Sequence, residues 1–260
     1  MRRRAVRSGG AAAQCTKVTY VILEVSGDDI HHHVCLNAQL EQQRPHAVIV
    51  CVEHTLHTGE QSFAEILSCI VGDKIAHVEM QSFLKVLLQM QRPVNILEVG
   101  TAVGFSTLLF CEYAPKEAKI TTIEKYEKRI PIAKENFRKA GKESQIRFLE
   151  GDATEILAEL EGSYDFIFMD AAKGQYIHFL PEVLRVLDKN GVLITDNVLQ
   201  DGDVIESRFA VERRNRTIHK RMREYLFELT HNEGLLTSVV PLGDGIAITM
   251  KSHEKREETI

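Results

Sequence analysis

The chain has 260 residues, of which 44% are hydrophobic and 27% charged, and its formal net charge at pH 7 is −5. This composition is typical of a globular protein with a sizeable core, and the acidic balance argues against a protein that coats nucleic acid. The five cysteines form no Cys-x-x-Cys pair, and no apolar run approaches the ~20 residues that span a bilayer. We therefore expect free thiols in a cytoplasmic protein without a membrane segment.

The first part of the chain differs in pattern from the rest. Residues 1–75 have poor periodicity and weak turn signals, and they contain a His31-His32-His33 run. We interpret this run as incidental, because three adjacent side chains point in different directions. The basic start at Met1-Arg2-Arg3-Arg4 is not followed by an apolar stretch, which argues against a secretory signal. We predict an N-terminal extension of unclear structure over 1–75 and one domain over 76–260.

From Val78 onward, apolar runs with strand and helix patterns alternate. Turn residues at Gly141, at Asn190-Gly191 and at Asp244-Gly245 separate several of them. This order predicts an α/β, Rossmann-like, doubly wound and mostly parallel seven-stranded sheet with a C-terminal antiparallel strand pair. In chain order, the pattern predicts a helix over Phe83–Leu88, a strand over Asn95–Val99, a helix over Phe105–Cys111, a strand over Lys119–Ile123, a helix over Tyr126–Ala140, a strand over Ile146–Leu149, a helix over Thr154–Leu160, a strand over Tyr164–Met169, a helix over Tyr176–Leu187, a strand over Val192–Thr195, a helix over Ser207–His231, and strands over Thr237–Val240 and Ile246–Met250.

A loop with two glycines joins the first predicted strand of this sheet to the next helix. It reads Glu98-Val-Gly100-Thr-Ala-Val-Gly104-Phe-Ser106. Glycines there allow a close approach of backbone to ligand and leave the helix N-terminus facing it. The Gly-x-x-x-Gly spacing differs from the Gly-x-Gly-x-x-Gly of dinucleotide binders, which disfavours a nicotinamide-dependent oxidoreductase.

Acidic residues follow four successive parallel strands, where ligands of such sheets bind. Glu124 can accept hydrogen bonds from two ribose hydroxyls, and Asp152 can reach an adenine edge. Asp170 and Asp196-Asn197 end the next two strands, and neighbouring strands would bring them together. Two carboxylates and an amide oxygen form the all-oxygen ligand set that magnesium favours. Each acid alone could equally be a solvated or helix-capping side chain.

This arrangement resembles the class I S-adenosylmethionine-dependent methyltransferases over about Val78 to Met250, and among them the cation-dependent O-methyltransferases related to the catechol and caffeoyl-CoA enzymes. The resemblance implies Lys173 as the general base and a metal site of Asp170, Asp196 and Asn197. It also implies a homodimer. The cofactor residues that it implies are Glu98, Gly100, Thr101, Ser106, Glu124, Asp152, Ala153 and Asp170.

Within that family the sequence is most similar to bacterial tRNA 5-hydroxyuridine methyltransferases. Three segments carry this likeness: Met169–Tyr176, Ile194–Leu199 and Val240–Ala247. The expected reaction is methylation of the 5-hydroxyl of 5-hydroxyuridine at the tRNA wobble position, giving 5-methoxyuridine.

A local cluster of basic residues after the metal loop supports an RNA acceptor, because arginine suits phosphate groups. We expect Arg213, Arg214, Arg216, Lys220 and Arg221 to bind RNA, with Arg208 and Arg223 nearby. A solvated helix face balanced by glutamates, or a dimer contact, would give the same pattern. Two alternative functions stay open: an O-methyltransferase acting on catechol-like small molecules, and a non-catalytic RNA-binding protein with a cofactor pocket.

Overall fold

The structure is a computed structural model that describes residues 17–21, 50–54 and 78–252. The His31-His32-His33 run and most of the expected extension over 1–75 lie outside the described residues. The chain divides into two compact units, Met1–Glu65 and Ile66–Ile260. In the first unit, β1 (Lys17–Val21) pairs with β2 (Val50–His54) in antiparallel register.

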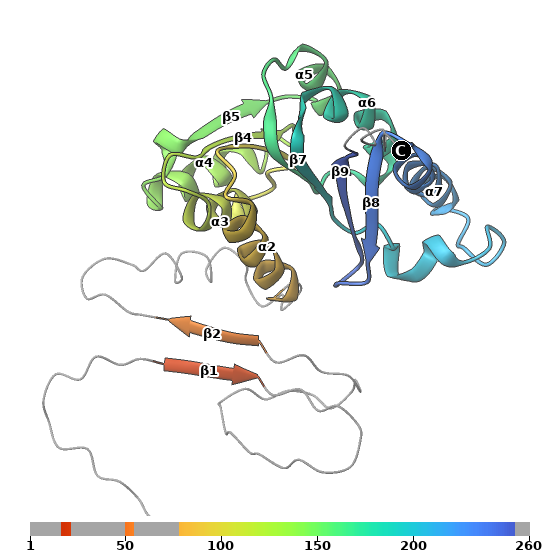
Figure 1. The fold of residues 1–260 in the computed structure, drawn as a ribbon, viewed down its shortest axis with the longest axis horizontal. Coiled ribbons are helices and arrows are strands. Elements are labelled where there is room, and N and C mark those ends of the chain that lie inside the picture. Colours follow the sequence, from red (N-terminus) through yellow and green to blue (C-terminus); the bar gives the residue numbers. More distant parts are fainter. Residues whose placement is uncertain (1–16, 22–49, 55–77, 253–260) are drawn as a thin grey trace, which may run out of the picture. The chain divides into compact units, whose positions relative to one another are not determined.

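In the second unit, the described residues form a seven-stranded sheet with the order β5-β4-β3-β6-β7-β9-β8 (Figure 1). The strands from β5 to β7 are parallel, whereas β9 runs antiparallel to both β7 and β8. This arrangement confirms the predicted fold class. The strands are β3 (Asn95–Val99), β4 (Lys119–Glu124), β5 (Ile146–Glu150), β6 (Tyr164–Met169), β7 (Leu187–Thr195), β8 (Leu235–Val240) and β9 (Ile246–Lys251).

Helices cover both faces of the sheet, and each face has its own apolar core. Along β6, Phe166 and Phe168 join the core that includes residues of α2 and α3, whereas Ile167 and Met169 join the core that includes residues of α6 and α7. Both sets are apolar because a parallel sheet buries both faces. The helices are α2 (Val78–Gln91), α3 (Phe105–Tyr113), α4 (Ile130–Lys139), α5 (Ala153–Glu159), α6 (Tyr176–Val186) and α7 (Arg216–His231). Every helix in the described ranges is too short or too polar to span a bilayer.

Two predicted helices begin later than expected. The helix expected from Tyr126 begins at Ile130, because the backbone N–H of Tyr126 donates to the Glu124 carboxylate at 2.8 Å and keeps this segment at the strand end. The helix expected over Ser207–His231 begins only at Arg216. Among residues 207–215 only Val211 is buried, so this stretch has no apolar face for a helix to pack.

The predicted turn at Asn190-Gly191 is wrong, because both residues lie inside β7, which begins at Leu187. The pairing of β6 with β7 is irregular between Tyr164 and Phe166. A Cβ on Gly191 would lie 2.9 Å from the Tyr164 carbonyl oxygen. Glycine therefore allows two strands to approach closely here and does not form a turn.

Candidate functional site

The register of the parallel strands brings the predicted site residues to one edge of the sheet. Val99 of β3 pairs with Met169 of β6, and Met169 pairs with Thr195 of β7. Hydrogen bonds continue this pattern one residue further, since Asp170 N–H donates to the Val99 carbonyl and Asp196 N–H to the Met169 carbonyl, both at 3.0 Å. The two aspartates therefore leave the sheet side by side.

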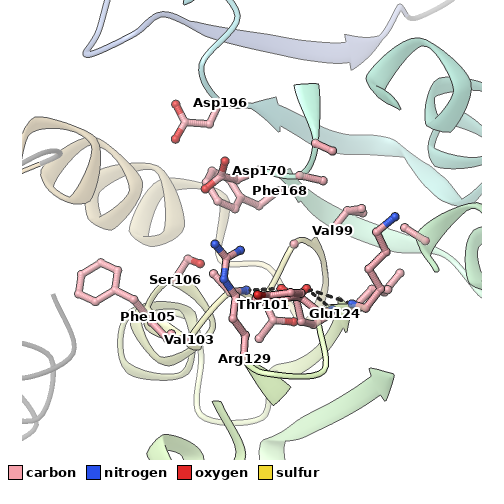
Figure 2. A pocket seen from close by; sticks show the side chains of 18 of the residues that line it. Val99, Thr101, Val103, Phe105, Ser106, Glu124, Arg129, Phe168, Asp170 and Asp196 are labelled. Atoms are coloured by element: carbon pink, nitrogen blue, oxygen red, sulfur yellow. Dashed lines mark hydrogen bonds between the residues drawn. The ribbon is translucent and has the colours of Figure 1, made fainter. Parts of the chain in front are cut away.

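A cavity of about 880 Å³ lies at this edge (Figure 2). Its walls come from α2, from the loop after β3, and from the ends of β4, β5, β6 and β7. Its size is in the range of pockets that enclose a small ligand. The predicted cofactor and metal residues on its wall are Gly100, Thr101, Ser106, Glu124, Asp152, Ala153, Asp170 and Asp196.

Gly100 is required by the packing of the loop against β6. Its φ is +107°, and a Cβ there would lie 2.1 Å from the Asp170 carbonyl oxygen. No side chain fits in that space, so glycine is what allows the loop to lie directly beside the end of β6. The sequence pattern predicted a close approach of this backbone to a ligand, which stays a prediction; the close approach in the structure is to the backbone of Asp170.

The Glu124 carboxylate is fixed by three backbone N–H groups. Ala102 and Tyr126 donate to it at 2.8 Å and Lys125 at 3.0 Å, as the dashed lines in Figure 2 show in part. A carboxylate offers about four lone-pair positions, so at least one remains for a ligand hydroxyl. The side chain is 8% exposed and lines the cavity.

Asp152 caps the start of α5 and stays an acceptor at neutral pH. Its carboxylate accepts from the Thr154 N–H at 2.8 Å and lies 3.1 Å from Lys125 Nζ. Hydrogen bonds from Thr154, and then from Lys125, hold the pKa of Asp152 below its usual value. Asp152 therefore lines the cavity wall and also caps a helix, which was the alternative explanation for an acid at this position.

Glu98, which the resemblance implies as a cofactor residue, lies behind the cavity wall rather than on it. It is completely buried behind Ser106, and its carboxylate accepts hydrogen bonds from the hydroxyls of Ser106, Thr107 and Thr122. Burial raises its pKa to about 7. Glu98 can therefore act on a ligand only through hydroxyls that line the cavity: directly through Ser106, or through Thr122 and then Thr101.

The predicted metal ligands differ in their access to the cavity. Asp170 is exposed and Asp196 is only 5% exposed, and both line the wall. Asn197 stands beside them with a φ of +57°, and its backbone N–H donates to Asp196 Oδ1 at 2.7 Å, but it does not line the cavity. Among the described residues, no group of three or more His, Cys, Asp or Glu side chains is placed to hold a metal ion. A cation here would thus depend on two carboxylates and an amide, a donor set that fits a hard ion with several waters.

Lys173 lies just outside the cavity wall, at the start of a short 3₁₀ helix (Lys173–Gln175). Its Nζ contacts Asp244 Oδ2 at 3.1 Å. Asp244 also holds the loop after β7, because Leu199 N–H donates to the Asp244 carbonyl at 2.9 Å. Asp244 was predicted only as a turn residue, and the structure adds its link to both loops.

Two buried tyrosines lie behind the site. Tyr176 OH donates to the Asp196 carbonyl at 3.3 Å, and Tyr225 OH lies 2.6 Å from Thr195 Oγ1. The rings pack edge to face with centroids 5.6 Å apart, and burial raises the pKa of both phenols. They fix the end of β7 from behind. Nothing in the sequence of α7 distinguished Tyr225 from an ordinary core residue of a helix.

Several of the predicted RNA-binding side chains contact their own chain. Arg214 pairs with Glu212 at 2.7 Å and Lys220 with Glu224 at 3.5 Å. Arg216 donates to the Val211 carbonyl and Arg221 to the Gly174 carbonyl, while Arg213 is exposed. A second, smaller pocket of about 350 Å³ is lined by Arg208, Arg216, Thr217, Lys220, Arg221 and Glu224.

The sequence of residues 67–252 matches the O-methyltransferase family. The chain belongs to this family. It is 35% identical over 128 residues to the catechol O-methyltransferase of Niastella koreensis, a match that covers 48% of this chain and 58% of that enzyme. It is 32% identical over 182 residues to the caffeoyl-CoA O-methyltransferase of Medicago sativa, covering 64% of this chain and 70% of that enzyme.

A solved structure supports the same assignment. The methyltransferase PaMTH1 of Podospora anserina, whose crystal structure contains S-adenosylhomocysteine, superposes with a TM-score of 0.63 at 26% identity. The match covers 70% of this chain and 81% of that one. These matches confirm the prediction that the chain belongs to a family of S-adenosylmethionine-dependent O-methyltransferases. The two enzymes compared by sequence are named for catechol and caffeoyl-CoA, so the predicted tRNA acceptor gains no support from them.

The packing of Gly100 yields a direct test of the cavity. We expect Gly100→Ala to displace the loop and to weaken binding of S-adenosylhomocysteine by about tenfold or more. The loss of ~1.4 kcal/mol of binding free energy, about that of one polar contact, raises the Kd tenfold. Isothermal titration calorimetry measures the affinity. Gly162→Ala is the matched control: Gly162 has a similar φ of +103° but nothing within 4 Å of an added Cβ. Wild-type affinity in Gly100→Ala would contradict this account of the loop.

Proposed function

We propose that this protein transfers the methyl group of S-adenosylmethionine to one of two adjacent hydroxyls on a small aromatic acceptor such as a catechol. One observation carries the proposal: Asp170 and Asp196 line the same cavity as the residues suited to the cofactor. Donor and acceptor sites at one strand edge allow the in-line geometry of methyl transfer. Such positioning contributes ~7–11 kcal/mol to many catalysed reactions.

For the cofactor, the proposal assigns different ends of the molecule to different strand ends. Glu124 would accept from the ribose hydroxyls, since its backbone contacts already fix its orientation. Asp152 and Ala153 would lie against the adenine. Gly100, Thr101 and Ser106 would then flank the amino-acid end, near α3.

For the metal, Asp170, Asp196 and Asn197 would hold a divalent cation such as magnesium. A bound cation lowers the pKa of a hydroxyl that coordinates to it. The two carboxylates would balance the charge of such a cation. The exposure of Asp170 leaves that side open to an acceptor.

Lys173 is assigned as the general base. In its neutral form, Lys173 would take the proton from the acceptor hydroxyl at Nζ. The resulting oxyanion would form the C–O bond to the methyl carbon as the C–S bond breaks, and S-adenosylhomocysteine would leave. Asp244, whose Oδ2 lies 3.1 Å from Nζ, would stabilise the lysine in its ammonium form after the transfer. The small side chains of Ala171 and Ala172, both on the cavity wall, leave room beside the acceptor.

The test is methyl transfer from labelled S-adenosylmethionine to 3,4-dihydroxybenzoate. We expect turnover with Mg²⁺, loss of turnover with EDTA, and no transfer to 4-hydroxybenzoate, which has no adjacent hydroxyl pair to chelate. Asp196→Asn should lower the rate by roughly a hundredfold or more, because it removes a charged ligand.

The exposed Glu161 provides a control for loss of one surface carboxylate, and Glu161→Gln should retain the wild-type rate. Full activity in EDTA, or equal transfer to both benzoates, would refute the metal-chelating part of the proposal.

A tRNA acceptor is the second candidate, and the basic pocket around Arg208 and Lys220 favours it. Arginine and lysine side chains gathered in one hollow can bind phosphate groups. In this alternative the acceptor is 5-hydroxyuridine at the wobble position, whose O4 and O5 resemble the oxygens of a catechol. The homodimer implied by the family resemblance remains a prediction under either candidate.

The second candidate predicts that Arg208→Gln/Lys220→Gln weakens methylation of hydroxyuridine-bearing tRNA. The salt dependence of tRNA affinity should become shallower by ~0.7 for each single-strand phosphate that the variant no longer neutralises. The catechol reaction should be unchanged. Lys116→Gln/Lys189→Gln, at two exposed residues outside both pockets, controls for the loss of two positive charges. Absence of label in tRNA with the wild-type protein would eliminate this candidate.

A further inference from the structure

A buried group of polar side chains lies directly behind the cofactor cavity. Glu98 of β3 accepts from Thr122 of β4 at 2.5 Å, and from Ser106 and Thr107 at the start of α3. The side chains of Glu98, Thr107 and Thr122 are fully buried. Ser106 lines the cavity, so it is the member through which this group can contact a ligand.

The ionised form of Glu98 fixes the direction of every hydroxyl around it. A hydroxyl has one hydrogen to donate, and a carboxylate can only accept. Ser106 therefore directs its hydrogen at Glu98 and offers only lone pairs to the cavity. Thr122 likewise uses its hydrogen on Glu98, so Thr101 must donate in the 2.6 Å contact between the two threonine hydroxyls.

The cavity near Ser106 is otherwise suited to an anion. Phe105 and Ser106 form the first turn of α3 and both line the wall, as Figure 2 shows. The first intrahelical hydrogen bond runs from Leu108 N–H to the Gly104 carbonyl, so the preceding N–H groups have no acceptor within the helix. These groups and the helix dipole favour a carboxylate. A ligand carboxylate, however, requires a donor from Ser106, not a lone pair.

These two requirements conflict unless Glu98 gains a proton. We propose that Glu98 is a positioning residue for the cofactor carboxylate, and that cofactor binding transfers one proton from solvent to Glu98. Protonated Glu98 donates to Ser106 Oγ, and Ser106 then donates to the cofactor carboxylate. The inference rests on the proposed use of this cavity for S-adenosylmethionine.

The surroundings of Glu98 place the uptake in the neutral range. Burial raises its pKa to about 7, and the negative charge of Asp170, at the end of β6, adds to that effect. The nearby titratable group on α3 is Cys111. Burial raises the pKa of its thiol to about 12, so this thiol stays neutral near pH 7. From β4, the side chain that contacts Glu98 is Thr122, which does not titrate in this range. In the free protein, the Glu98 carboxyl is thus partly protonated near pH 7.

Calorimetric titration with S-adenosylhomocysteine, in buffers of different ionisation enthalpy, measures the proton uptake. We expect an uptake close to zero at pH 6 and about one proton per bound S-adenosylhomocysteine at pH 8. The Kd for S-adenosylhomocysteine should rise roughly tenfold per pH unit above 7. 5′-Methylthioadenosine, which lacks the amino-acid end, should bind without this uptake.

Glu98→Gln is the decisive variant, because its amide mimics the protonated acid. The amide NH₂ can donate to Ser106 while its carbonyl accepts from Thr107 and Thr122. We expect this variant to bind S-adenosylhomocysteine with no proton uptake and no change of Kd between pH 6 and 8. Ser106→Ala, which keeps Glu98, should bind more weakly and also lose the uptake.

The outcomes separate this inference from the proposed function. The inference is supported if the wild type takes up a proton with S-adenosylhomocysteine but not with 5′-methylthioadenosine, and if Glu98→Gln takes up none. Binding without uptake, or uptake that persists in Glu98→Gln, overturns it and leaves the proposed function intact. If the wild type binds neither ligand at any pH, the proposed function is overturned and this inference with it.

Discussion

The register between β3, β6 and β7 is the constraint on which the site depends. Because Val99, Met169 and Thr195 are paired across three parallel strands, the residues that follow them emerge together. A shift of one residue in either pair would turn Asp170 or Asp196 to the opposite face. Gly100 makes the arrangement possible, since a side chain there would occupy the position of the Asp170 carbonyl.

The cavity is supported from behind by buried polar groups. Glu98, behind Ser106, and its three hydroxyl partners lie on the side proposed for the cofactor. Tyr176 and Tyr225 hold the end of β7, on the side proposed for the cation. Every such group costs free energy to bury unless it is hydrogen-bonded, so the partners found for each of them keep the wall rigid. Rigid support of this kind allows the carboxylates on the wall to keep fixed positions before a ligand arrives.

Much of the fold and the cavity wall could be predicted from sequence. Short apolar runs located the strands and amphipathic runs located the helices. The rule that ligands bind at strand ends identified Glu124, Asp152, Asp170 and Asp196 as residues of the cavity wall. Prediction failed where tertiary contacts outweigh local pattern.

The burial of Glu98, the extension of β7 through Gly191 and the late start of α7 at Arg216 all depend on packing partners far away in the chain. The contact of Lys173 with Asp244 likewise joins two loops that are 71 residues apart in the sequence. No local pattern in either segment indicates such a pairing.

The most direct measurement is a crystal structure of the protein grown with S-adenosylhomocysteine and Mn²⁺, with the metal located by its anomalous scattering. The account predicts one anomalous peak bound by the carboxylates of Asp170 and Asp196, and the cofactor in the 880 Å³ cavity with its ribose at Glu124. A cofactor outside that cavity, or a metal peak that does not contact both aspartates, would contradict the claim that strand register builds a joint cofactor and cation site.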